Sequence, residues 1–221
     1  MRTKLTAADG NECSAYEVAP VGAGASIVIV QEIFGVNAHV RSVVDRYASF
    51  GYRAIAPALF DRVEPDVELG YDEDGIARGR ELATAIAFDG AIADVAAAVD
   101  HVAGTGPVGV IGYCFGGSLA WLAASQLPVA AAVGYYGGQI HGLIDRTPVA
   151  PTMLHFGELD HAIPLDQVEA IAAAHPDVIV HVYEGAQHGF NCDARASHDP
   201  LSAAVAQGRT LEFLLANEVR P

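Results

Sequence analysis

The sequence predicts an α/β domain built on a mostly parallel, doubly wound sheet with helices on both faces. Short apolar runs rich in β-branched residues alternate along the chain with longer alanine-rich segments of helical spacing. Several of these runs are almost continuously apolar, as strands buried on both faces of a parallel sheet are. The chain has 221 residues and no repeat or linker that divides it, so we expect residues 1–221 to form one domain.

The individual elements follow from the same two patterns. Six runs have the length and composition of strands; in chain order they are 25–31, 52–59, 107–113, 129–136, 151–157 and 178–185. The segments with helical spacing between them are 38–51, 89–104, 117–127, 165–175 and 199–217. Asp89 and Asp199 are suitable N-caps, while Gly51 and Gly104 are suitable C-caps. The acidic segment 60–75 contains a proline and two glycines, and it is expected to be a surface excursion, either a solvated loop or a lid.

Composition excludes several classes of function. The formal net charge is −15, with no cluster of basic residues, so the surface repels nucleic acid and anionic membranes. No apolar run is long enough to span a bilayer, and the N-terminus lacks the apolar region of a secretory signal. Three cysteines without such a signal indicate free thiols in a reducing compartment. A cytoplasmic location is therefore expected, without nucleic-acid or membrane partners.

Cys114 lies in the stretch VIGYCFGGSL, between an expected strand and an expected helix. Gly112 and Gly116 flank it at two residues on either side, which is the spacing of the nucleophile elbow of α/β-hydrolases with cysteine in place of serine. The turn is so tight that both flanking residues must be very small. A buried structural cysteine is the alternative, but the strand–turn–helix context favours a nucleophile near a helix N-terminus, where a thiolate is stabilised.

Asp160 and His188 follow Cys114 in the chain order nucleophile, acid, histidine. Each lies just past an expected strand end, on the same edge of the sheet as Cys114. His188 would accept the thiol proton, and Asp160 would fix the histidine's tautomer and orientation. Either residue alone would be interpreted as an exposed loop residue, but the ordered set of three indicates a catalytic triad.

Glu32 ends the run SIVIVQE and precedes Gly35. It either caps the following turn or stands close to Cys114, where its carboxylate would disfavour the resting thiolate and receive the thiol proton. The sequence contains no metal-binding or phosphate-loop pattern, so no metal or cofactor is expected.

Five segments together resemble the dienelactone hydrolase (carboxymethylenebutenolidase) family. They are QEIFGVN (31–37), GYCFGG (112–117), VGYYGG (133–138), GELDHAIP (157–164) and YEGAQHGF (183–190), and the resemblance extends over residues 14–216. It implies an α/β-hydrolase fold and a Cys114–His188–Asp160 triad in which Glu32 holds the resting thiol. It also implies an oxyanion hole formed by the backbone N–H groups of Ile33 and Phe115.

The family's substrate is an anion whose carboxylate is held by two arginines. The first corresponds to Arg78, with Arg80 as a neighbouring alternative; at the second position this chain has Cys192, with Arg195 three residues further on. Tyr135 and Tyr136 correspond to the family's tyrosine pair, which either lines the pocket or serves packing. The anion site is thus only half matched.

The expected function is hydrolysis of a small-molecule lactone or ester through a covalent thioester, with substrates of the dienelactone type and a role in the degradation of aromatic compounds. A broad esterase or thioesterase acting on neutral acyl groups is one alternative. A thiol redox sensor or ligand-binding protein on a hydrolase scaffold is another. The protein is expected to be a monomer or a small homo-oligomer.

Overall fold

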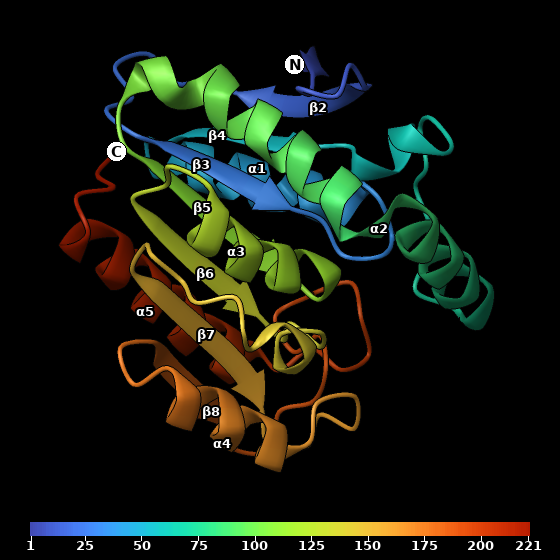
Figure 1. Ribbon diagram of the computed structural model, residues 1–221, viewed down its shortest axis with the longest axis vertical. Coiled ribbons are helices and arrows are strands. Elements are labelled where there is room, and N and C mark those ends of the chain that lie inside the picture. Colours follow the sequence, from blue (N-terminus) through green and yellow to red (C-terminus); the bar gives the residue numbers. More distant parts are fainter.

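The computed structural model describes residues 1–221, which form one eight-stranded sheet (Figure 1). The strands are β1 (Arg2–Thr6), β2 (Glu12–Val18), β3 (Ser26–Val30), β4 (Arg53–Pro57), β5 (Val108–Tyr113), β6 (Ala131–Tyr135), β7 (Thr152–Gly157) and β8 (Ile179–Tyr183). Their order across the sheet is β1-β2-β4-β3-β5-β6-β7-β8. The pairs β1–β2 and β2–β4 are antiparallel and all others are parallel, which confirms the expected mostly parallel sheet.

Five helices cover the sheet on both faces. They are α1 (Ala38–Ser49), α2 (Glu73–Val102), α3 (Phe115–Gln126), α4 (Leu165–Ala174) and α5 (Pro200–Ala216), together with the 3₁₀ turns η1 (Leu59–Arg62), η2 (Ala103–Thr105) and η3 (His141–Leu143). Helices α1 and α5 lie behind the sheet in Figure 1, and α2, α3 and α4 lie in front of it. The doubly wound arrangement predicted from the alternation of strands and helices is therefore confirmed.

The position of β3 in the middle of the sheet, covered by helices on both faces, explains why its sequence is apolar throughout. All five of its residues are buried. Ile27 and Ile29 belong to the core cluster that includes α1 and α5, whereas Val28 and Val30 belong to the cluster that includes α2 and α3. Successive side chains of a strand point to opposite faces, so a strand covered on both faces needs an apolar residue at every position.

Two parts of the fold were not predicted. The N-terminal strands β1 and β2 are half-exposed, and β2 alternates buried and partly exposed residues, so neither has a continuous apolar run. Helix α2 begins at Asp72, whose side chain accepts a hydrogen bond from Gly75 N, and not at Asp89 as expected. Gly75 and Gly79 interrupt the helical pattern there.

Helix α2 is not straight. Ala87 has φ 51° and ψ 170°, so the segment before it projects at the right of Figure 1 beside the carboxyl ends of the strands. Contrary to the sequence expectation, the region Glu73–Thr105 is long and apolar enough to cross a membrane by length and composition alone. Its second half packs on the sheet through Val95, Val99 and Val102.

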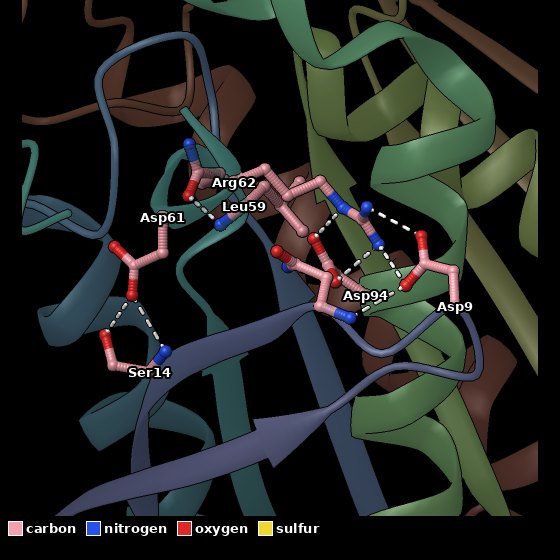
Figure 2. A network of polar contacts seen from close by, with 8 residues as sticks. Asp9, Ser14, Leu59, Asp61, Arg62 and Asp94 are labelled. Atoms are coloured by element: carbon pink, nitrogen blue, oxygen red, sulfur yellow. Dashed lines mark hydrogen bonds and ion pairs between the residues drawn. The ribbon is translucent and has the colours of Figure 1, made fainter. Parts of the chain in front are cut away.

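A buried ion pair fixes the position of α2 on the sheet (Figure 2). Arg62 Nε lies 2.7 Å from Asp94 Oδ2, and the Asp94 side chain is fully buried. The same guanidinium contacts Asp9 at 2.7 Å, in the turn between β1 and β2. The network thus joins the N-terminal hairpin, η1 and α2.

The strand register brings the sequence-predicted site residues to one edge of the sheet. Val30 of β3 pairs with Gly112 of β5, and Gly157 of β7 pairs with Tyr183 of β8. The residues that follow these four strands, where Glu32, Cys114, Asp160 and His188 occur, therefore emerge on the same side.

Candidate active site

Cys114 occupies a strained turn between β5 and α3. Its backbone has φ 53° and ψ −112°, in a region that L-residues rarely adopt. A Cβ atom on Gly112 would overlap the carbonyl oxygen of Gly116, and one on Gly116 would overlap that of Val30. The structure therefore gives the reason for the glycines on both sides of the cysteine: only glycine fits, and the turn holds Cys114 above the sheet.

His188 and Asp160 lie in line with the thiol. His188 Nε2 is 3.2 Å from Cys114 Sγ, and His188 Nδ1 is 2.8 Å from Asp160 Oδ2. Asp160 is buried, and its other oxygen accepts a hydrogen bond from Ala162 N at 2.9 Å. Burial by itself would lower the pKa of His188, but the Cys114 thiolate and Asp160 outweigh it and raise that pKa to about 10. His188 therefore keeps its proton to a higher pH than an ordinary imidazole does.

Two backbone donors beside the sulfur have no acceptor within the protein. The Ile33 and Phe115 N–H groups make no hydrogen bond to backbone or side chain. Phe115 is the first residue of α3, so its N–H also lies at the positive end of the helix dipole. The side chain of Gln31 donates to the Glu32 carbonyl oxygen at 3.3 Å and accepts from Leu59 N at 3.1 Å. Because the Glu32 carbonyl and the Ile33 N–H share one peptide plane, Gln31 orients that donor.

Glu32 is 1 % exposed, and neither carboxylate oxygen has a hydrogen-bond partner. Its nearest counter-charge is Arg195, whose Nη1 lies 3.5 Å from Oε1. Burial, followed by the charge of Glu32, raises the pKa of the neighbouring Cys192 thiol to about 11. The Cys114–Glu32 hydrogen bond implied by the resemblance is not formed, because the Cys114 sulfur is turned towards His188. The role of Glu32 stays a prediction.

Arg195 comes to the site from the loop that follows His188. Its guanidinium lies over the rings of Phe34 and Tyr71, at 5.7 and 5.9 Å from their centroids. It also packs against Gly189, where a Cβ atom would lie 2.5 Å from Nη1. Arg195, three residues past the position at which the resemblance places the second arginine, thus reaches Glu32.

Of the three expected substrate-binding residues, Tyr135 and Tyr136 contact each other, whereas Arg78 is engaged elsewhere. Arg78 is half-exposed, and its guanidinium pairs with Glu64 and Glu81 on the outer side of α2. Tyr135 is fully buried, and its hydroxyl is 2.7 Å from Thr210 Oγ1, so it is a packing residue and not a pocket residue. Tyr136 is also buried, but its ring lies 5.1 Å from that of His188 and its hydroxyl has no partner.

Two cavities flank the site, and most of their lining residues were not predicted. One, of about 530 Å³, is lined by Ile33, Arg80, Ala83, Thr84, Ala87, Phe88, Phe115 and Gln139. The other, of about 760 Å³, is lined by Tyr71, Asp72, Gln187, Ala194, Arg195, Ala196 and Ser197. Part of the expected excursion 60–75 forms a wall, since Leu69 N donates to Phe34 O at 2.9 Å and the ring of Tyr71 packs on that of Phe34. No group of three or more His, Cys, Asp or Glu side chains is arranged to hold a metal ion.

Comparison with known proteins decides the family. Residues 13–217 match the model of the dienelactone hydrolase family. The chain belongs to the dienelactone hydrolase family. It is 34% identical over 217 residues to the carboxymethylenebutenolidases of Pseudomonas putida and Pseudomonas knackmussii, and the alignment covers 93% of this chain and 92% of theirs.

Solved structures agree with this assignment. A proposed dienelactone hydrolase from Klebsiella pneumoniae has a TM-score of 0.83 at 29% identity, with 97% of this chain and 98% of that chain covered. The dienelactone hydrolase of Anabaena variabilis has the same fold, with a TM-score of 0.74 at 18% identity over 98% and 96% of the two chains. The family resemblance and the α/β-hydrolase fold inferred from the sequence are thus confirmed, and the chain is a hydrolase that acts on lactones or esters.

Proposed function

We propose that this dienelactone hydrolase family member cleaves its substrate by attack of the Cys114 sulfur on the acyl carbon, and that its substrates are of the carboxymethylenebutenolide type. The observation that carries the proposal is the hydrogen-bonded chain from Cys114 Sγ through His188 to Asp160, held at a turn that only flanking glycines permit. The family membership supports the substrate class.

In the first half of the reaction the thiolate forms a carbon–sulfur bond, and the carbonyl π electrons move to oxygen. The Ile33 and Phe115 N–H groups, which have no other acceptor, stabilise this oxyanion. When the carbonyl re-forms, the bond to the leaving oxygen breaks, and the proton on His188 Nε2 neutralises the alkoxide or enolate. The product of this half is a thioester on Cys114.

In the second half, His188 Nε2 accepts a proton from water as the water oxygen attacks the thioester carbon. The second oxyanion collapses, the carbon–sulfur bond breaks and the acid is released, with the sulfur leaving as thiolate beside the imidazolium. Asp160 holds the imidazole with Nε2 towards the sulfur throughout, at 2.8 Å from Nδ1.

Glu32 is proposed to accept the thiol proton when a substrate binds to the protonated enzyme. Its support is a buried carboxylate with no donor hydrogen-bonded to either oxygen, so that both oxygens retain the capacity to accept. A thiol kept protonated until substrate is present is protected from oxidation and alkylation.

A broad esterase or thioesterase acting on neutral acyl groups is the second candidate. The pairing of Arg78 with two glutamates favours it, because the expected carboxylate-binding arginine is engaged elsewhere. A thiol sensor would not need Asp160 aligned behind His188, which weakens that alternative. The cytoplasmic location, the part in aromatic degradation and the oligomeric state stay predictions.

The deciding experiment compares hydrolysis of dienelactone with that of a neutral aryl ester, using wild type and Cys114→Ala in parallel. Dienelactone turnover that is lost in the variant supports the full proposal, whereas turnover of the neutral ester alone supports the second candidate. A Cys114→Ala variant that keeps its fold and most of its activity removes the mechanism. Rapid oxidation of Cys114 by peroxide, with no ester turned over by wild type, would favour the sensor.

A further inference from the structure

The loop from Phe190 to Asp199 carries Arg195 and forms one wall of the cavity of about 760 Å³. Its two ends are close together, since Asp199 N donates to Phe190 O at 3.0 Å, and the Asp199 side chain caps α5. Further along the loop, Arg195 N donates to Cys192 O and His198 N donates to Arg195 O, each at 3.1 Å. These backbone bonds close the loop on itself, so its tip must be held to the rest of the protein by side chains.

The tip of the loop is joined to the protein by Asp193 and Arg195. Asp193 Oδ1 lies 2.8 Å from His39 Nδ1. Two residues further on, the Arg195 guanidinium reaches Glu32 at 3.5 Å. Asp193 and Arg195 belong to one turn, residues 192–195, which is closed by the hydrogen bond of the Arg195 N–H. A contact that holds Asp193 therefore also restricts where the guanidinium of Arg195 can lie.

His39 lies in the first turn of α1, and its ring is almost completely buried. The side chain is 2% exposed, and Nε2 has no hydrogen-bond partner. A proton on Nε2 would have no acceptor, so the proton of the neutral ring is assigned to Nδ1, which donates to Asp193. An apolar side chain would fill the same space without burying an unpartnered nitrogen. The bond to Asp193 is therefore the reason for a histidine at this position.

Asp193 is a charged acceptor for this bond. Burial by itself would raise its pKa, but the hydrogen bond with His39 and the nearby charge of Arg46 outweigh burial and lower that pKa. Hydrogen bonds to a carboxylate are roughly twice as strong as those between neutral groups. Arg46 is the more distant partner, with Nη2 3.9 Å from Asp193 Oδ2, and its Nη1 donates to Gln207 at 3.3 Å. His39 is thus the main side-chain contact of Asp193.

We propose that His39 is a positioning residue of the active site. By holding Asp193, it keeps the Arg195 guanidinium beside Glu32. The negative charge of Glu32 is then compensated, and the thiolate of Cys114 is less disfavoured. His39 touches neither the substrate nor the reacting atoms, and it acts only through the turn that carries Arg195. The inference rests on the role proposed for Glu32 and adds a residue outside the triad on which that role depends.

The test measures how fast iodoacetamide alkylates Cys114 at neutral pH, followed by mass spectrometry of the peptide that contains it. His39→Leu should slow the reaction by about twofold to fivefold, a coupling usual for residues in one hydrogen-bond and ion-pair network. His39→Asn should restore the wild-type rate, because an asparagine amide can donate from the position of Nδ1. Asp193→Ala should give the same loss as His39→Leu. Its side chain is 53% exposed, so this variant keeps the test available if the buried substitution disturbs folding.

The same substitution in the Glu32→Gln background separates positioning from support of the fold. Arg195 then has no carboxylate to compensate, so adding His39→Leu should not change the alkylation rate further. A loss of equal size in both backgrounds would show that His39 supports the fold only, and it would overturn the inference.

His175→Leu is the matched control. This partly buried histidine also makes one hydrogen bond, between Nε2 and Ile144 O at 2.7 Å. The control should lower stability in urea and leave the alkylation rate of Cys114 unchanged. Slower alkylation in the control as well would assign the effect of His39→Leu to lost stability and would reject the inference.

The remaining outcomes separate the inference from the proposals on which it builds. If Glu32→Gln and Arg195→Met change the rate but His39→Leu and Asp193→Ala do not, the inference is rejected and the role of Glu32 stands. If Glu32→Gln leaves the rate unchanged, both are rejected. A wild type that hydrolyses no ester rejects the proposed function, whereas the alkylation rates still decide on His39.

Discussion

Arg195 Nη1 lies 3.5 Å from Glu32 Oε1, and this is the only counter-charge within ion-pair distance of a carboxylate that is 1 % exposed. A buried carboxylate without a compensating charge is strongly disfavoured. Glu32 also acts on its surroundings, since its charge is the main electrostatic contribution, after burial, to the raised pKa of Tyr136 and of Cys192. From the role proposed for Glu32, we expect the charge of this pair to act on the Cys114 thiol as well.

Glu32→Gln is expected to speed alkylation of Cys114 at neutral pH. Removing a nearby negative charge favours the thiolate, and each unit by which the thiol pKa falls raises the thiolate fraction by up to about tenfold. The measurement is the rate of reaction with iodoacetamide between pH 5 and 9. An unchanged rate and pH profile would show that Glu32 does not act on the thiol.

Arg195→Met should have the opposite effect on that rate, because it leaves the Glu32 charge uncompensated. The double variant Glu32→Gln/Arg195→Met should resemble Glu32→Gln alone, since Arg195 then has no carboxylate to neutralise. Additive effects of the two changes would mean that Arg195 acts on the thiol directly and not through Glu32.

The stability of the fold is expected to fall at alkaline pH through His188. Burial opposes its charge, yet Cys114 and Asp160 raise its pKa from 6.5 to about 10 in the folded protein. A raised pKa means that the folded state binds the proton more tightly, so the stabilisation is complete below about pH 6.5 and is lost as the pH rises through 10.

Urea unfolding of wild type and Cys114→Ala between pH 6 and 10 measures this contribution. Because the thiolate is the larger of the two effects that raise the pKa, the variant should show a weaker loss of stability over the range. Parallel pH profiles for the two proteins would show that Cys114 does not raise the pKa of His188.

Gln31→Met is expected to reduce kcat by about tenfold to a hundredfold with a smaller effect on KM. The change removes the hydrogen bonds that orient the Glu32–Ile33 peptide, and loss of a single oxyanion donor reduces kcat by about 10²–10³-fold. Asn11→Ala, which removes a hydrogen bond to Asp94, is a control for lost stability alone. An equal loss of kcat in both variants would assign Gln31 a structural role only.

Ala87→Gly is expected to stabilise the protein by about 0.5–1 kcal/mol. Ala87 has φ 51° and ψ 170°, a conformation that only glycine adopts without strain. Ala85→Gly is the matched control: it lies two residues earlier in regular helix and should destabilise by about 1 kcal/mol. Thermal unfolding of the two variants gives the comparison, and the same sign of change in both would show that Ala87 carries no strain.

The strands of the parallel core could be predicted because they depend on local sequence patterns. A continuous apolar run identifies a strand such as β3 or β5 wherever it lies, and the glycines around Cys114 identify the turn because the steric requirement involves only a few neighbouring residues. The chain order of Cys114, Asp160 and His188 then predicted a hydrogen-bonded set that the structure contains.

The residues that shape the substrate cavities depend on contacts between distant segments. The sequence favoured Arg78 as a substrate-binding residue. In the structure, Gly79 packs against the Ile33 carbonyl and Leu82 enters the core, and these two contacts fix the rotation of α2 about its axis. With this rotation, Arg78 pairs with Glu64 and Arg80 lines the cavity of about 530 Å³. Strands β1 and β2 have no continuous apolar run. They are part of the sheet because β1 pairs with β2 and β2 pairs with β4, which lies far along the chain.

The sequence by itself therefore determined the fold class, the family and the chain order of Cys114, Asp160 and His188. The tertiary structure alone decided which arginine meets Glu32 and that the sulfur of Cys114 turns towards His188. The physical reason is that strand periodicity and turn sterics act over a few residues, whereas the rotation of a helix and the direction of a side chain are fixed by packing against segments far away in the chain.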